Sequence, residues 1–165
     1  MNRYFEIAFK KENGKAVDVW KNARIPEYST RSSAGADFFC AEEVTIPSLW
    51  KMVFKNLIIK PTMVHTGIKA HMPEDEVLYI MNRSGGPKKG LILANNIGVI
   101  DADYYGCDAN DGEIMFAFYN FFPFDITIQV GDKIGQGVFH KMLRAENAIK
   151  SNNERTGGFN STGNK

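Results

Sequence analysis

The chain has 165 residues, 44% of them hydrophobic, and a formal net charge of +1 from 20 basic and 19 acidic side chains. This length fits one domain with a single core, and the balanced charge argues against a polynucleotide or membrane-surface partner, since both need surplus cations. The N-terminal segment is polar and alternating, so we expect no signal peptide and no membrane span. Two cysteines cannot make a disulfide framework, which favours free thiols in a reducing cytoplasm.

Apolar residues occur along the chain in short alternating or β-branched runs, which predict strands. The runs cover residues 4–9, 16–20, 44–46, 52–54, 57–59, 63–70, 77–81, 114–118, 126–128 and 134–139. Turn signals such as Asn13-Gly14 and Gly131-Asp132 separate them. Many short strands indicate an all-β sandwich or barrel. Residues 144–149 are the best helix candidate, and we expect one domain at 1–150 followed by a low-complexity tail at 151–165.

The tail combines glycines with Arg155, Phe159, Ser161 and Thr162 and has no apolar periodicity. Such a segment cannot fold by burying itself. Glycine backbone and hydroxyl groups offer donors to anions, arginine binds phosphate, and an aromatic ring covers a flat base. The composition suits a lid that orders over a nucleotide, although a solvated tail of accidental composition looks the same.

The strongest chemical signal lies between Asn95 and Tyr104. Asp101 follows an apolar run, and a carboxylate at the end of such a strand is partly desolvated and suits a general base. Asn96-Ile97-Gly98 indicates a turn, which predicts a β-hairpin with Asn95 near its tip, where its amide can read a base edge. The ring of Tyr104 could floor a sugar. The alternative is an ordinary hairpin whose acidic residues face water.

Three further segments carry weaker signals, two of them suited to phosphate. Residues 83–90 place Arg83, Ser84 and two lysines around glycines, which suits a phosphate cradle or a plain basic loop. They do not match the Walker pattern, which opens a helix. Gln136 lies inside the apolar strand 134–139, where a buried amide needs partners. Asp37 follows the small residues 32–36.

Two features carry no chemical expectation. The segment Cys107–Gly112 lacks the spacing of a calcium loop, so we expect a solvated turn. His65, His71 and His140 have no metal-ligand spacing and are expected to be structural.

The five segments, in this order and spacing, resemble the five motifs of the trimeric dUTP pyrophosphatases (dUTPases), over about residues 25–163. The resemblance implies an all-β, distorted jelly-roll (β-clip) barrel that forms a homotrimer with active sites at subunit junctions. It implies Mg²⁺-dependent hydrolysis of dUTP to dUMP and pyrophosphate, which keeps uracil out of DNA and supplies dUMP for dTMP synthesis.

The resemblance also implies a role for each matching residue. Asp101 corresponds to the catalytic aspartate that activates water, and Asp37 to the aspartate that reaches the metal through water. The residues implied to bind uracil and deoxyribose are Asn95, Gly98, Tyr104 and Phe159. The residues implied to bind the phosphates are Arg83, Ser84, Gly85, Gln136, Arg155, Ser161 and Thr162. Two departures are Asn82, where proline usually precedes the arginine, and Tyr105, which replaces an arginine or glutamine.

Other readings of the same segments remain open. The dCTP deaminases resemble this fold but use a glutamate where this chain has Ala117, and alanine cannot transfer a proton. A binding protein that uses the scaffold to regulate a protein partner would present a surface at residues 107–112. A generic β-sandwich ligand module is the third alternative. The combination of Asp101, Tyr104, Arg155 and Phe159 favours an enzyme.

Overall fold

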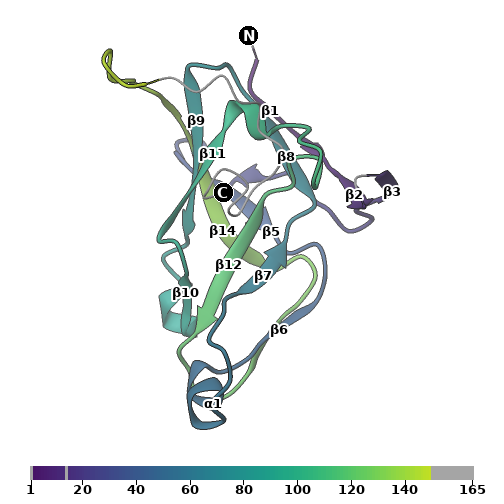
Figure 1. Cartoon of the computed structure of the whole chain (residues 1–165), viewed down its shortest axis with the longest axis vertical. Coiled ribbons are helices and arrows are strands. Elements are labelled where there is room, and N and C mark those ends of the chain that lie inside the picture. The colour runs from purple at the N-terminus through teal and green to yellow at the C-terminus, as the bar shows by residue number, and fades with distance from the viewer. Residues whose placement is uncertain (1, 14, 150–165) are drawn as a thin grey trace.

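The structure, a computed structural model, describes residues 2–13 and 15–149 (Figure 1). A five-stranded sheet has the order β11 (Ile97–Asp101), β9 (Glu76–Asn82), β14 (Lys133–Lys141), β5 (Ala36–Phe39) and β4 (Glu27–Tyr28). A three-stranded sheet has the order β10 (Leu91–Leu93), β12 (Met115–Asn120) and β7 (Thr62–His65). The named strands pair antiparallel, as expected for strands joined by short connections.

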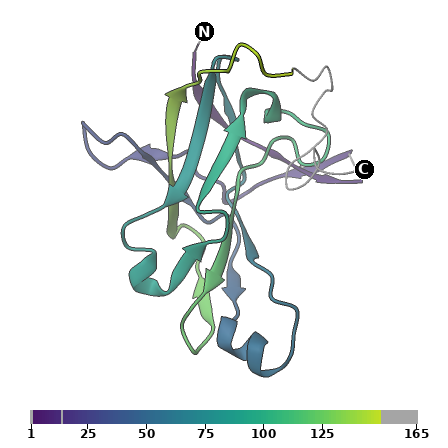
Figure 2. The ribbon, with the colours of Figure 1, turned by 60° about the vertical axis from the view of Figure 1, so that its left-hand side comes forward.

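Three two-stranded pairs complete the β-structure. They are β1 (Tyr4–Ile7) with β8 (Ile68–His71), β13 (Ile126–Ile128) with β6 (Val44–Ile46), and β2 (Phe9–Glu12) with β3 (Lys15–Val19). The helical elements are α1 (Leu49–Phe54) and the short 3₁₀ turns η1 (Pro87–Lys89) and η2 (Ala102–Tyr104). The β2–β3 ribbon projects from the side of the body, and α1 lies at the end opposite β1 (Figures 1 and 2). Within the described ranges, no helix is long and apolar enough to cross a membrane.

One hydrophobic core joins the two larger sheets. Phe38 of β5, Leu78 of β9 and Phe116 of β12 are fully buried in it. The rings of Phe38 and Phe116 lie 5.6 Å apart between centroids. Gly135 of β14 makes room for this packing, because a Cβ there would lie 1.9 Å from Cε1 of Phe116. Two sheets that share one apolar layer fit a jelly-roll barrel and confirm the all-β prediction.

Three predicted elements were wrong, and one strand was missed. Residues 52–54 belong to helix α1, which Ser48 caps, and residues 57–59 form no strand. Residues 144–149 form turns rather than a helix. Strand β5 escaped notice because all its residues are buried, so its sequence does not alternate. Short apolar runs are ambiguous between strand and helix until their packing partners are known.

The expected β-hairpin around Asn95 was also wrong. Strand β10 before the turn pairs with β12, while strand β11 after it pairs with β9. The turn, in which Asn96 has a φ of 58°, therefore passes the chain from one sheet to the other. Asparagine tolerates this left-handed conformation better than other non-glycine residues do.

The segment 107–112 is not the solvated turn that we expected. Cys107 and Asp111 are only 5% and 7% exposed. Asp111 accepts hydrogen bonds from the backbone N–H of Phe9 and from Nζ of Lys69, both at 2.9 Å. It thereby joins the N-terminal strands to β8. Within the segment only Asp108 and Ala109 are exposed, which leaves little surface for the protein partner considered above.

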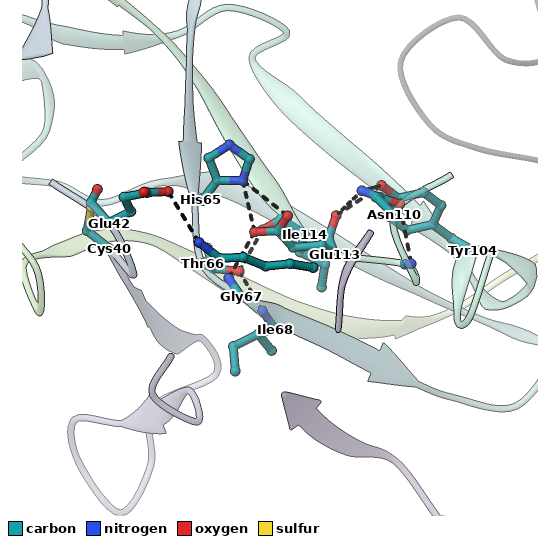
Figure 3. Close-up of polar contacts among 12 residues, drawn as sticks. Cys40, Glu42, His65, Thr66, Gly67, Ile68, Tyr104, Asn110, Glu113 and Ile114 are labelled. Atoms are coloured by element: carbon teal, nitrogen blue, oxygen red, sulfur yellow. Dashed lines mark hydrogen bonds and ion pairs between the residues drawn. The ribbon is translucent and has the colours of Figure 1, made fainter. Parts of the chain in front are cut away.

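Glu113, which is buried, links the end of this segment to the β7–β8 turn (Figure 3). Its carboxylate accepts hydrogen bonds from Nδ1 of His65 at 3.1 Å and from the backbone N–H of Gly67 at 3.0 Å. Its carbonyl accepts from the Tyr104 hydroxyl at 2.9 Å and from Nδ2 of Asn110 at 3.1 Å. The Glu113 hydrogen bond raises the pKa of His65 above its ordinary value, against the opposing effect of burial.

Candidate functional site

A charged cluster surrounds Asp37 on β5. Its Oδ1 lies 2.9 Å from Nε of Arg83, and its Oδ2 lies 2.9 Å from Nζ of Lys133. The Ser29 hydroxyl donates to the same Oδ2 at 2.5 Å. Burial alone would raise the pKa of Asp37, but the bonds from Ser29 and Lys133 and the charge of Arg83 hold it below its ordinary value. Asp37 is therefore a carboxylate that positions two cations.

Gln136 lies next to this cluster. It is directly opposite Asp37 on one side of β14 and opposite Met81 on the other. Its Nε2 donates to the carbonyl of Asn82 at 3.4 Å. Gly35 gives its side chain room, since a Cβ there would lie 2.9 Å from Oε1 of Gln136. Gln136 is partly exposed rather than buried as expected, and its contact with phosphate stays a prediction.

The loop 83–90 forms the outer wall of a small pocket of about 90 Å³. Arg83, Gly85 and Lys89 line one side of it, and Lys133 lines the other. Ser84 and Gly85 are exposed, so their donors can meet a ligand. Three cationic side chains around glycine backbone form a suitable environment for phosphate oxygens.

Asp101 is not among the residues that line that pocket, and instead it lines a second cavity with a volume of about 840 Å³. It is the last residue of β11, directly opposite Val77 of β9, and it is half-buried. Asp103, Glu74 and Asp75 line the same cavity. Arg144 also lines the cavity, and Asp75 is paired with Nζ of Lys141 at 2.6 Å, so the carboxylates are partly compensated by cations.

The predicted uracil-side residues lie along β11 and just after it. Asn95 is exposed in the turn before the strand, and Gly98 is buried against Ile80. A Cβ on Gly98 would lie 2.4 Å from Cγ1 of Ile80 and 3.4 Å from Nδ2 of Asn95, so these two predicted residues are neighbours. Tyr104 is 4% exposed, and its hydroxyl is bonded to Glu113. Because the hydroxyl is engaged, a contact with a sugar would have to come from the ring of Tyr104, and it stays a prediction.

The two halves of the site share one face of the five-stranded sheet but lie far apart on it. Asp101 is opposite Val77, and Gln136 is opposite Met81, so the two lie four steps apart along β9. At about 3.3 Å per residue this is roughly 13 Å. Because strand residues four apart point to the same side, Asp101 and Gln136 face the same way. One chain does not bring them into contact.

Apolar side chains fill the space between the two halves. Ile97 and Val99, on the same face of β11 as Asp101, are 51% and 55% exposed. Tyr79 lies opposite Val99, with Val138 on its other side, and both are partly exposed. An exposed apolar face that separates two groups of polar site residues is typical of a protein–protein contact.

The oxygen ligands near Asp37 determine whether a divalent metal fits this site. Across residues 2–13 and 15–149, no three His, Cys, Asp or Glu side chains come together as a metal site. The oxygens of Asp37 already accept from Ser29, Lys133 and Arg83, which suits contact through water better than direct ligation. A metal here would take most of its ligands from the phosphates of a nucleotide, as Mg²⁺ commonly does.

Some predictions lie outside the described residues, and one contributor was missed. The lid residues Arg155, Phe159, Ser161 and Thr162 belong to residues 150–165, which the structure does not describe. Lys133 was overlooked because it follows a turn signal, and its partner Asp37 lies 96 positions away. A cation beside the predicted strand of Gln136 was the only signal that could have suggested it.

Comparison with known proteins identifies the family of the chain. A dUTPase family model matches residues 21–163. The deoxyuridine 5'-triphosphate nucleotidohydrolase of Lactococcus lactis subsp. lactis is 42% identical over 153 residues, covering 90% of this chain and 95% of that protein. The corresponding protein of Wolinella succinogenes is 32% identical, covering 93% and 96%.

Solved structures give the same result for the fold. The dUTPase from Streptococcus mutans is 32% identical, with a TM-score of 0.68 and coverage of 87% of this chain and 98% of that one. The dUTPase from phage phi11 of S. aureus is 20% identical, with a TM-score of 0.65 and coverage of 93% and 99%, and so supports the fold alone. Since the family match spans most of the sequence, including every segment singled out above, the chain belongs to the dUTPase family.

Proposed function

We propose that the protein hydrolyses dUTP to dUMP and pyrophosphate, with Asp101 as the general base. The observation that carries this proposal is the position of Asp101, a half-buried carboxylate at the end of β11 that lines a cavity of about 840 Å³. Membership of the dUTPase family and the names of the relatives support the reaction.

The site residues described above suffice for the chemical step. Asp101 takes a proton from water, whose oxygen forms a bond to the α-phosphorus. The bond from that phosphorus to the bridging oxygen breaks, and pyrophosphate leaves with the electron pair. Arg83, Ser84 and Gln136 stabilise the charge that develops on the phosphate oxygens. A bound Mg²⁺ would neutralise the leaving group, with Asp37 holding one of its waters.

Selectivity for uracil would come from Asn95 and the backbone around Gly98. Cytosine presents the opposite pattern of donors and acceptors, so its binding would leave buried polar groups unpaired, a mismatch that enzymes reject strongly. The ring of Tyr104 would pack on the deoxyribose, and Phe159 would cover the base. Arg155, Ser161 and Thr162 would hold the outer phosphates when the tail closes as a lid. The cytoplasmic location stays a prediction.

We further propose that the complete site forms between copies of the chain, as in the homotrimer that the resemblance implies. Asp101 and Gln136 are separated by roughly 13 Å along β9 and lie on the two strands that flank it. This supports the proposal, because one substrate must touch both groups. The exposed side chains of Ile97 and Val99 support it as well, since a second copy would bury them.

The first test measures pyrophosphate release from dUTP, dCTP, dTTP and UTP, with Mg²⁺ and then with EDTA. We expect release from dUTP alone and its loss in EDTA. Asp101→Asn should lower kcat at least about a thousandfold and leave binding of a non-hydrolysable dUTP analogue intact. Asp103→Asn, in the same cavity, is the matched control and should keep turnover within about tenfold. Undiminished turnover by Asp101→Asn would defeat the assignment of the base.

Deamination is not proposed, because Ala117 of β12 is a buried alanine in the strand where a deaminase-like member needs a glutamate. Ammonia release from dCTP in the same assay would contradict this exclusion.

A further inference from the structure

The loop that would hold the phosphates is closed at its base by an asparagine. Asn82, the last residue of β9, donates from Nδ2 to the carbonyl of Leu91 at 2.8 Å. Leu91 is the first residue of β10, on the far side of the loop 83–90. One side chain therefore joins the two ends of the loop.

The same side chain explains a glycine inside the loop. Gly86 has a φ of −58° and a ψ of −51°, which are values that any residue adopts. Its backbone does not require glycine. A Cβ on Gly86, however, would lie 2.0 Å from Oδ1 of Asn82 and 2.6 Å from its Cγ. Gly86 must therefore be glycine because Asn82 occupies the space beside it. Gly85 differs, since a Cβ there would meet no atom within 4 Å.

Gly86 passes any displacement on to the rest of the loop. Its N–H donates to the carbonyl of Arg83 at 2.9 Å, and its own carbonyl accepts from the N–H groups of Lys89 and Leu91 at 3.0 and 3.1 Å. A shift of Gly86 would move Arg83 and the exposed Ser84–Gly85 segment together. The position of the phosphate donors thus depends on the contact between Asn82 and Gly86.

The side chain of Asn82 carries a cost in stability. Its Oδ1 is buried and, among the described residues, has no hydrogen-bond partner. An unpaired buried acceptor is destabilising, and such groups in folded proteins call for a reason. Its backbone carbonyl also accepts from Nε2 of Gln136, so the same residue contacts a second predicted phosphate ligand.

We propose that Asn82 and Gly86 act as one positioning unit that fixes Ser84 and Gly85 for the triphosphate. Asn82 is a positioning residue, and it does not touch the reacting atoms. This inference rests on the phosphate role proposed above for Arg83, Ser84 and Gly85. Asn82 at the end of β9 and Gly86 in the loop have no role among those that the family resemblance implies.

A double-mutant cycle tests the unit. Asn82→Ala removes the bond to Leu91 and should raise KM for dUTP about tenfold, with a smaller change in kcat. Gly86→Ala alone displaces the Asn82 side chain or the loop, because its Cβ would lie 2.0 Å from Oδ1 of Asn82, and should lower kcat/KM about a hundredfold. The double variant lacks the three Asn82 side-chain atoms that lie nearest to the new Cβ, so it should resemble Asn82→Ala and retain far more activity than the thousandfold loss that independent effects would give.

Two further readouts separate positioning from general stability. The inhibition constant of a non-hydrolysable dUTP analogue should rise in Asn82→Ala, while that of deoxyuridine, which has no phosphate, stays unchanged. Gly85→Ala serves as the control for the unfolding temperature, because its Cβ has free space. If Gly86→Ala alone fails to fold, recovery of folded protein in the double variant supports the coupling.

The outcomes distinguish this inference from the proposed function. Wild-type protein that releases no pyrophosphate from dUTP would defeat the proposed function. Active wild-type protein whose two substitutions simply multiply would overturn the positioning unit alone. An equal loss of deoxyuridine and triphosphate-analogue binding would do the same.

Discussion

The buried ion pair between Lys69 and Asp111 offers a quantitative test of how the segment 107–112 is held. The two side chains are 11% and 10% exposed, and Nζ of Lys69 lies 2.9 Å from Oδ2 of Asp111. The ring of Tyr105 lies 4.8 Å from the same ammonium, and Glu6 is directly opposite Lys69 on β1. Removing one partner of a buried pair costs about 3–5 kcal/mol, because the other charge stays buried without compensation.

Asp111→Asn is the cleanest perturbation. Asp111 has a φ of 61°, and asparagine tolerates this conformation, so the substitution adds little backbone strain. The amide oxygen can still accept from the Phe9 N–H, which leaves the lost charge as the main change. We expect a loss of about 3 kcal/mol in the free energy of unfolding, at the lower end of the range for buried pairs. For a chain of this size this corresponds to about 6–12 °C in Tm.

Urea unfolding followed by tryptophan fluorescence measures the loss. Asp108→Asn is the matched control, because Asp108 is exposed in the same segment and should change stability by no more than about 0.5 kcal/mol. Lys69→Met combined with Asp111→Asn removes the uncompensated charge and should recover much of the stability. If Asp111→Asn costs less than about 1 kcal/mol, the segment is not anchored by this pair and the reasoning fails.

Two further predictions concern the core and the Glu113 network. The raised pKa of His65 means that its contribution to stability is complete below its ordinary value of about 6.5 and is lost as the pH rises through the raised value. Between about pH 6 and pH 9, the free energy of unfolding of the wild type should therefore fall more than that of His65→Gln, whereas the exposed control His140→Gln should follow the wild type; parallel curves for His65→Gln and wild type would contradict the linkage. Gly135→Ala should cost about 1–3 kcal/mol because its Cβ meets the fully buried ring of Phe116, and Phe116→Leu in the same chain should relieve part of the loss. A neutral Gly135→Ala in urea unfolding would show that the ring can move aside.

The sequence could predict those elements that have one solvent-exposed and one buried face, or a clear apolar run. Strands β9, β12 and β14 belong to this group. Strand β5 does not, because its four residues are all buried and give no alternation. Helix α1 was hidden for a related reason, since a short apolar run carries no period of its own.

Tertiary contacts set the remaining limits. The partners of Asp111 lie 102 and 42 positions away, so its burial could not be read from local pattern. The cluster around Asp37 has the same origin, because Arg83 comes from the loop after β9 and Lys133 from the start of β14. Motif order suggested which residues belong to the site. Which of them one chain brings together depends on strand register, and neighbouring spacing in the sequence does not reveal it.

The position of Asp101 at one end of β9 and of Gln136 toward the other has a consequence for the protein in dilute or mixed populations. We propose above that the halves of the site belong to different copies, and such a site exists only while those copies are associated. On that proposal catalysis depends on association, and it is lost on dilution even when each chain remains folded. A single faulty chain in an assembly also disables junctions to which its intact neighbours contribute, so damage spreads beyond the molecule that carries it.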